Sequence, residues 1–209
     1  MIARLVLRLP NRARQALLRP LESGSWRRRA YAAPSPPHIK RAVLLRACTH
    51  PATWVETGTY LGDTTAALAR SGALHVYTIE PDRKLAARAR ARFSQMPTVT
   101  VVEGASEDVL PELLPTLAGP VAFWLDGHYS GGVTHQGTTD TPIRQELQAI
   151  ADHLGALRPV TVVVDDVRCF DPTIAAYAGY PSRDDLIDWA RGNGLAWHVE
   201  HDMFVARGS

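Results

Sequence analysis

Short apolar runs alternate along the chain with longer segments whose apolar residues recur at helical spacing. Runs of about five residues bounded by turn-forming residues are typical of buried strands, and the longer segments are typical of helices. Strands are predicted at residues 53–57, 75–80, 99–103, 121–126 and 160–164, and helices at 63–70, 82–93, 108–117, 141–153 and 182–191. Strands that alternate with helices predict a parallel α/β sheet with helices on both faces.

Two further strands are predicted near the end of the chain, over residues 195–200 and 203–207. Only His201 and Asp202 separate them, and a two-residue connection is typical of an antiparallel hairpin. The expected fold is therefore α/β, with a seven-stranded, mostly parallel sheet that ends in an antiparallel hairpin. At 209 residues, of which 45% are hydrophobic, the chain is long enough to bury one sizeable core.

The first 37 residues have a different character, and we interpret them as a basic N-terminal arm with a Pro-rich linker, ahead of a main domain at 38–209. The first fifty residues hold eleven Lys or Arg against Glu22 alone, which leaves twelve of the 23 basic and twenty of the 21 acidic residues in the rest. The prolines at 33–37 predict a stiff, non-helical linker. Helical spacing over 38–48 predicts a helix that covers the sheet.

The arm is expected to be solvated or to contact a second copy of the chain, and we expect a homodimer. A basic segment with apolar residues can also contact an anionic membrane surface or nucleic acid. Arg4 and Arg8 interrupt its apolar run and Pro10 ends it, so no signal peptide is expected, and no stretch reaches transmembrane length. Cys48 and Cys169 are too few for a disulfide framework, which favours a cytoplasmic location.

The segment between the first predicted strand and the next helix carries the spacing Glu56-x-Gly58-x-x-x-Gly62. Glycine is needed where a backbone turns sharply or approaches a ligand closely. The following helix exposes unpaired N–H groups at its start, and Asp63 or Thr64 is expected to cap it. The spacing differs from the dinucleotide Gly-x-Gly-x-x-Gly motif, and it lacks the Gly-Lys-Ser/Thr run of a P-loop.

Acidic residues mark the ends of three other predicted strands. Glu80 ends the second strand, where a carboxylate can accept hydrogen bonds from both hydroxyls of a ribose. Asp126 ends the fourth strand, and Asp165 and Asp166 follow the fifth, so three carboxylates are expected to converge at the carboxyl edge of the sheet. Charges this close favour a bound cation, and hard oxygen ligands suit Mg²⁺ or Mn²⁺.

The strand order, the hairpin and these strand-end residues together resemble the class I S-adenosylmethionine-dependent methyltransferases, over roughly residues 53–209. The resemblance implies a Rossmann-like fold and S-adenosylmethionine as cofactor. The glycines would admit the methionine and ribose portions of the cofactor, and Glu56 would face its amino group or support the turn. The implied cofactor-binding residues are Glu56, Thr57, Gly58, Tyr60, Gly62, Thr64, Glu80, Gly104, Ser106 and Asp126.

The carboxylates of Asp126, Asp165 and Asp166 resemble the metal ligands of cation-dependent O-methyltransferases, such as catechol O-methyltransferase and the macrocin and mycinamicin sugar enzymes. The resemblance implies methyl transfer to a hydroxyl of a sugar or polysaccharide precursor, with 1-O-methylation of a methylated mannoside as the most specific expectation. The alternative is that Asp165 or Asp166 only caps the following loop, and that Asp126 contacts the cofactor sulfonium without a metal.

A polar, Gly-rich segment at 127–140 follows the fourth strand, and long segments of this kind tend to be binding loops. His128 is expected to be the general base, because the pKa of an imidazole lies near neutrality. A merely solvated histidine is the alternative. Tyr129 and His135 are expected to contact the acceptor, and Glu146 is expected at the surface of the next helix.

Two other classes of function stay open. A nucleic-acid methyltransferase could hold phosphates with the basic arm. However, the rest of the chain is acidic and has no Asn/Asp-Pro-Pro-Tyr motif, so nucleic acid is not the expected partner. A non-catalytic relative could instead bind a partner through the arm. We expect a small-molecule or oligosaccharide acceptor.

Overall fold

The computed structural model describes residues 11–126 and 141–209, and its strands form one mixed sheet in the order β3-β2-β1-β4-β5-β7-β6. Strands β1 to β5 are mutually parallel, and β7 pairs antiparallel with both β5 and β6. The predicted α/β sheet with its C-terminal hairpin is thereby confirmed. The strands are β1 (Thr53–Thr57), β2 (His75–Glu80), β3 (Val99–Glu103), β4 (Val121–Leu125), β5 (Val160–Val164), β6 (Ala196–Glu200) and β7 (Met203–Gly208).

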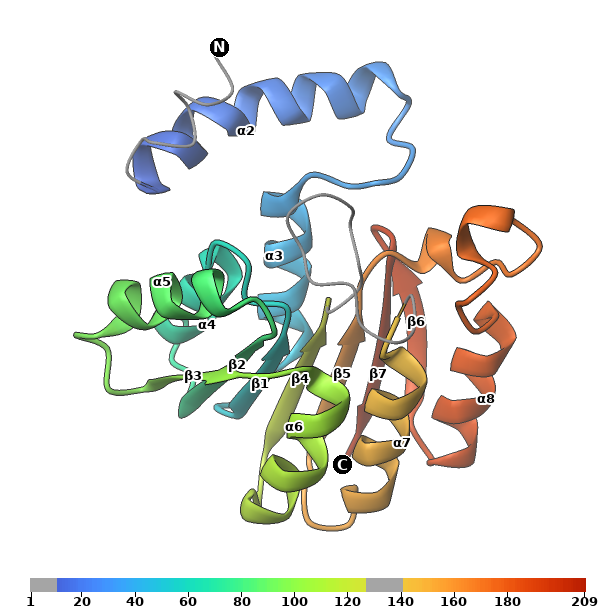
Figure 1. The fold of residues 1–209 in the computed structure, drawn as a ribbon. Coiled ribbons are helices and arrows are strands. Elements are labelled where there is room, and N and C mark those ends of the chain that lie inside the picture. Colours follow the sequence, from blue (N-terminus) through green and yellow to red (C-terminus); the bar gives the residue numbers. More distant parts are fainter. Residues whose placement is uncertain (1–10, 127–140) are drawn as a thin grey trace.

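Helices cover both faces of this sheet (Figure 1). One face packs against α3, α4 and α5, and the other against α6, α7 and α8. Successive residues of a strand point to opposite faces, so Trp124 packs on the α3 side while Phe123 packs on the α7 side. The helices are α2 (Asn11–Arg28), α3 (Pro37–Ala47), α4 (Asp63–Arg70), α5 (Arg83–Phe93), α6 (Ser106–Leu113), α7 (Ile143–His153) and α8 (Arg183–Gly192), with short 3₁₀ turns at Leu114–Thr116, Val167–Cys169 and Ala175–Tyr177.

The ends of the helices follow the local chemistry. Asp82 caps α5 through the N–H groups of Lys84 and Leu85. Ser182 and Asp185 form a capping box at the start of α8. Helix α6 begins at Ser106 and its last turn tightens at Leu114–Thr116, whereas residues 108–117 were predicted. Proline in that last turn lacks the N–H that a longer helix would use.

The strand register brings the ends of the central strands to one edge. Thr57 of β1 is level with Leu125 of β4, and Leu125 is level with Val164 of β5. The hydrogen-bond ladder continues one residue further, since Asp126 N–H donates to the Thr57 carbonyl at 3.2 Å and Asp165 N–H donates to the Leu125 carbonyl at 3.0 Å. The strand-end residues singled out in the sequence therefore lie side by side.

Residues 11–28 of the N-terminal arm form a helix that is docked on the rest of the molecule. Helix α2 lies across the carboxyl ends of the strands (Figure 1). Near one end, Arg14 pairs with Asp63 at the start of α4. At the other end, the Trp26 ring lies 5.0 Å from the Tyr31 ring and 5.6 Å from that of His201, in the turn between β6 and β7. Helix α2 thus contacts the rest of the chain near both its ends through the buried Arg14 and Trp26, while its other described side chains are exposed or partly exposed.

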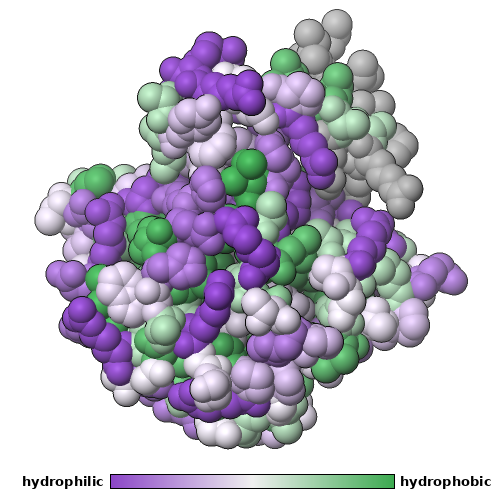
Figure 2. Space-filling view, turned by 180° about the vertical axis from the view of Figure 1, so that it is seen from behind, coloured by the Kyte–Doolittle hydropathy of each residue, from purple (hydrophilic) through white to green (hydrophobic). Residues whose placement is uncertain are grey.

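The reverse side of the molecule is mostly hydrophilic, and its hydrophobic side chains appear in small separate groups (Figure 2). Scattered apolar residues are normal on a folded protein surface. Within the described ranges, no helix is long and apolar enough to cross a membrane.

Candidate active site

The β1–α4 turn has a left-handed backbone at three places, Gly58 (φ 85°), Tyr60 (φ 48°) and Gly62 (φ 73°). A Cβ on Gly62 would lie 2.8 Å from the Phe93 ring of α5. The missing side chain of Gly62 therefore makes room for Phe93, and the expectation that this glycine admits a ligand is not supported. Gly58 directly follows β1, at the carboxyl end of that strand.

Glu56 lies inside the protein, with 1% of its surface exposed. Its Oε2 accepts hydrogen bonds from the hydroxyls of Thr65 and Thr78, and the Thr65 backbone N–H also binds the carboxylate. Burial raises the pKa of Glu56 to about 7, and these hydrogen bonds oppose that rise. Through these contacts the side chain supports the turn, which is one of the two roles that the resemblance implies.

Glu56 also takes the part that the sequence assigned to Asp63 or Thr64. No side chain of the N-cap residue Gly62 can cap α4, and the Thr65 N–H in its first turn is bound by Glu56. Asp63 instead forms ion pairs with Arg14 and Arg92. The predicted cap was wrong, because the Glu56 carboxylate from the preceding strand binds the Thr65 N–H in place of a side chain at the helix start.

Glu80 ties the end of β2 to the β1–α4 turn. Its Oε2 accepts a hydrogen bond from the Tyr60 N–H at 2.7 Å, and its Oε1 accepts one from the Asp82 N–H at 3.0 Å. The side chain is 4% exposed, and burial raises the pKa of this carboxyl. Each carboxylate oxygen has a second lone pair, so Glu80 retains acceptor capacity for a ribose diol.

The end of β3 lies next to Glu80, since Gly104 N–H donates to the Glu80 carbonyl at 3.1 Å. Gly104 has a φ of 156°, and a Cβ there would lie 2.8 Å from Cγ2 of Val109. Ser106 is buried at the start of α6. The structure thus places Gly104 and Ser106 at the expected edge of the sheet, with Gly104 packed closely against Val109 of α6, the helix that follows it.

A cavity of about 340 Å³ opens beside these strand ends. Its walls come from the linker and α3, from Thr64 in the first turn of α4, and from the ends of β4 and β5. Asp126, Asp165 and Asp166 all line it, so the predicted convergence of the three carboxylates on one space is observed. Thr57 is buried beneath them and holds the Asp126 backbone through its carbonyl.

Lys40 of α3 lies between two of these carboxylates. Its Nζ is 2.6 Å from Oδ1 of Asp165 and 2.6 Å from Oδ1 of Asp166. Arg168 donates to both carboxylate oxygens of Asp166, at 2.6 Å to Oδ1, which Lys40 also binds, and at 2.9 Å to Oδ2. Burial raises the pKa of Asp165 to about 6 despite the opposing charge of Lys40. The positive charge that the carboxylates require is therefore supplied by the chain itself.

The described residues do not fit a divalent metal as they stand. Across residues 11–126 and 141–209, no group of three or more His, Cys, Asp or Glu is arranged to hold a metal ion. The Lys40 ammonium occupies the space between Asp165 and Asp166 that a cation would take. The prediction of Asp126, Asp165 and Asp166 as metal ligands thus gains no support, although all three line the same cavity.

Two buried charged residues were not assigned to the site from the sequence. Lys40 falls on the apolar stripe of α3, three and four residues before Val43 and Leu44. Glu146 is 1% exposed and precedes Leu147 on the buried side of α7, so the expectation that it lies at the surface was wrong. A charged residue in phase with the buried face of a helix is the signal that could have found both.

Glu146 adjoins the same strand ends from the opposite face of the sheet. With Asp165 and Tyr180 it lines a small space beside the ends of β4 and β5. The predicted base His128 and the predicted acceptor contacts Tyr129 and His135 lie outside the described residues.

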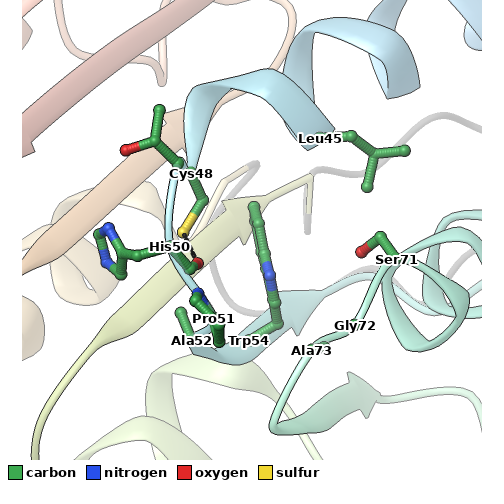
Figure 3. A pocket seen from close by; sticks show the side chains of 10 residues that line it. Leu45, Cys48, His50, Pro51, Ala52, Trp54, Ser71, Gly72 and Ala73 are labelled. Carbon is green, nitrogen blue, oxygen red and sulfur yellow. Dashed lines mark hydrogen bonds between the residues drawn. The ribbon is translucent and has the colours of Figure 1, made fainter.

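A second cavity, of about 240 Å³, lies at the opposite edge of the sheet. Figure 3 shows Cys48, His50 and Trp54 around it, with the Cys48 thiol donating to the His50 carbonyl at 3.2 Å. Its walls come from the end of α3, from residues 48–52, from Trp54 at the start of β1, and from residues 71–73 ahead of β2. It is therefore remote from the carboxyl ends, where open parallel sheets bind their ligands.

The topology and the strand-end residues define the fold of the class I S-adenosylmethionine-dependent methyltransferases. An O-methyltransferase family protein from Burkholderia thailandensis superposes with a TM-score of 0.53 and 13% identity, covering 82% of this chain and 56% of that one. The precorrin-6y C5,15-methyltransferase from Geobacter metallireducens GS-15 gives 0.51 and 15%, covering 81% and 87%. The 23S rRNA methyltransferase ErmE gives 0.52 and 19%, covering 83% and 69%.

These similarities concern the fold, and the three proteins have different acceptors according to their names. The sequence matches no protein-family model and no curated protein. A fold of this kind supports many chemistries, so the acceptor has to be argued from the site itself.

Proposed function

We propose that the protein is an S-adenosylmethionine-dependent methyltransferase that acts on a hydroxyl of a polar acceptor. The observation that carries the proposal is the bond between Glu80 and the Tyr60 N–H, which fixes a buried strand-end carboxylate against the β1–α4 turn. A ribose held by Glu80 would direct the rest of the cofactor along Gly58 toward Asp126. The adjacent cavity would then receive the acceptor.

S-adenosylmethionine supplies an electrophilic methyl group on a sulfonium. The chain's contribution is orientation, because in-line transfer requires the acceptor oxygen opposite the leaving sulfur. The hydrogen bonds that join β1, β4 and β5 one residue past their ends hold the backbones of Asp126 and Asp165 in fixed positions at the carboxyl edge. The acceptor hydroxyl must also lose its proton, and we keep His128 as the predicted base.

Pro34, Pro37 and Trp124 line the cavity together with charged and hydroxyl side chains, and we take the charged groups to favour a hydroxylated acceptor such as a sugar or polysaccharide precursor. Methylation at O-1 of a methylated mannoside is the most specific form of this proposal. Because Lys40 already binds Asp165 and Asp166, the proposal contains no metal-dependent step.

Methylation of RNA is the second candidate, and one feature of α2 favours it. Arg27 and Arg28, in its last turn, are exposed, and the helix borders the carboxyl edge. Exposed arginines can hold phosphates, in which case binding would weaken steeply with salt. A weak dependence on salt would argue for the small polar acceptor.

The cofactor assignment is tested by titration calorimetry with S-adenosylhomocysteine. Glu80→Ala should weaken binding at least tenfold, about 1.4 kcal/mol, because two ribose hydrogen bonds are lost. The matched control is Glu103→Ala, since Glu103 ends the neighbouring strand β3 level with Glu80 but is exposed and bound to Arg90. Equal affinity of the Glu80 variant and the wild type would refute the assignment.

The acceptor is tested with a labelled cofactor and a panel of glycans, catechols and RNA, each with Mg²⁺ and with EDTA. Label transfer to a glycan is the expected result. Transfer to RNA alone would replace the proposal by the second candidate. Loss of transfer in EDTA would show that Lys40 gives way to a metal during the reaction.

A further inference from the structure

Three cationic side chains line the carboxyl-edge cavity, and two of them are neutralised by carboxylates. Lys40 binds Asp165 and Asp166, and Arg168 binds Asp166 and Asp202. Arg41, the residue after Lys40 on α3, is different. It makes no ion pair or side-chain hydrogen bond with the described parts of the chain, 11–126 and 141–209, although it is partly buried.

The charged residues around Arg41 do not fully neutralise the positive charge of its guanidinium. Asp63 and Glu22 attract it, while Arg14 and Arg19 repel it. Asp63 is already bound by Arg14 and by Arg92 on the other side. Burial lowers the pKa of the Arg41 guanidinium, which indicates that its charge is held at a cost in this environment. An anion that entered the cavity would relieve that cost.

The wall around Arg41 suits one end of an amino acid. Thr64, in the first turn of α4, contributes a hydroxyl, and Asp126 contributes a carboxylate at the end of β4. A free amino acid carries a carboxylate and an ammonium on the same carbon. A guanidinium beside a hydroxyl matches the first group, and a carboxylate matches the second.

We propose that Arg41 is the anion-binding residue of this cavity, and that it pairs with the carboxylate of the methionine part of S-adenosylmethionine. The inference rests on the proposed function. It assigns the part of the cavity beside α3 and α4 to the amino-acid end of the cofactor, opposite the ribose end at Glu80, and leaves the part beside the end of β5 for the acceptor. A guanidinium binds a carboxylate through two parallel hydrogen bonds, which gives direction as well as affinity.

The proposal is tested by comparing two ligands that differ by the amino-acid group. S-adenosylhomocysteine carries the carboxylate, whereas 5′-methylthioadenosine has the same nucleoside and thioether without it. For Arg41→Met, calorimetry should show S-adenosylhomocysteine binding weakened about 10- to 100-fold, the usual range for a lost charged hydrogen bond. The affinity for 5′-methylthioadenosine should stay within about twofold.

Arg46→Met is the matched control, because Arg46 lies on the same helix but is exposed and bound to Glu200. It should leave both affinities unchanged. Arg41→Lys, which keeps the charge but not the paired donors, should give a smaller loss for S-adenosylhomocysteine alone. This variant also serves if Arg41→Met does not fold.

The affinities of the variants for the two ligands distinguish a failure of this inference from a failure of the proposed function on which it rests. If the Arg41 variants bind S-adenosylhomocysteine as the wild type does, the inference is overturned while the proposed function stands. If they lose both ligands equally while folded, Arg41 does not recognise the carboxylate, and the inference fails as well. A wild-type protein that binds neither ligand would overturn the proposed function itself.

Discussion

The Glu56 carboxyl lies inside the molecule, where its charge state is set by burial and by two threonine hydroxyls. Its pKa is raised to about 7 from an ordinary value near 4.5. The folded protein therefore binds a proton more tightly here than the unfolded chain does. The resulting stability is fully present below about pH 4.5 and is lost as the pH rises through about 7.

Replacing Glu56 by Gln should remove this dependence on pH. A glutamine can accept from the Thr65 N–H and donate to a threonine hydroxyl, so its hydrogen bonds remain possible. Relative to the variant, the free energy of unfolding of the wild type should fall by up to about 3 kcal/mol between pH 5 and pH 8. Urea denaturation across this range measures it, with the exposed Glu112→Gln as control. Parallel curves for the wild type and the Glu56 variant would contradict the buried acid.

Gly62 is a residue whose role is steric. Alanine there would combine a strained φ of 73° with a Cβ 2.8 Å from the Phe93 ring, so Gly62→Ala should lower the free energy of unfolding by about 2–4 kcal/mol. Gly72→Ala is the control, because Gly72 also has a positive φ, 91°, but nothing within 4 Å of its Cβ position. Urea denaturation gives the free energy of unfolding of both variants, and the difference between them separates the cost of backbone strain from the cost of the Phe93 contact. Equal losses would show that the Phe93 contact contributes nothing.

At the scale of an element, helix α3 packs on the sheet through Val43 and Leu44. It thereby places Lys40 beside Asp165, which follows β5. Removing one partner of a buried ion pair leaves an uncompensated charge. Lys40→Met should therefore lower the free energy of unfolding by about 3 kcal/mol at pH 7. The exposed Lys84→Met on α5 should have almost no effect.

The same variant should bind metal better than the wild type. Without the ammonium, Asp165 and Asp166 present two carboxylates to the cavity, which favours Mn²⁺ or Mg²⁺. Titration with Mn²⁺ followed by electron paramagnetic resonance is expected to show tighter binding by Lys40→Met. Binding by the wild type with equal affinity would mean that Lys40 moves aside.

The order and type of the elements could be predicted because local patterns determine them. Strands β4 and β5 are buried throughout and are rich in apolar residues, and two residues suffice to join β6 and β7. The strand-end positions of Glu80 and Asp126 followed from the rule that parallel strands end at one edge. What the sequence could not show is which partner each carboxylate would find.

Those partners come from distant parts of the chain. Lys40 and Asp166 are 126 positions apart, and Glu56 and Thr78 are 22 apart. No local pattern encodes such pairs, and the resemblance assigned Asp166 to a metal and Glu56 either to the cofactor or to the support of the turn. The phase of Lys40 and Glu146 on their helices was visible in the sequence, yet it reveals only that a charged group is buried.

At the scale of the whole molecule, α2 joins two sides of the sheet edge through Arg14 and Trp26. Trp26 is 8% exposed, so Trp26→Ala should release the helix while leaving the sheet intact. Hydrogen exchange followed by mass spectrometry should show residues 11–28 exchanging at least tenfold faster, with β1 and β4 unchanged. Leu21→Ala, at a side chain that is 65% exposed, is the control. Unchanged exchange in the Trp26 variant would show that the ring contacts do not hold α2.

The place of β7 between β5 and β6 has a consequence for biosynthesis. A ribosome makes this strand after the other six, yet it lies inside the sheet and pairs along both its sides. Until Met203–Gly208 has emerged, β5 presents an unpaired edge whose residues are all buried in the finished protein. Open apolar edges of this kind invite pairing between chains. The nascent polypeptide is therefore the form of this protein in which protection by chaperones matters most.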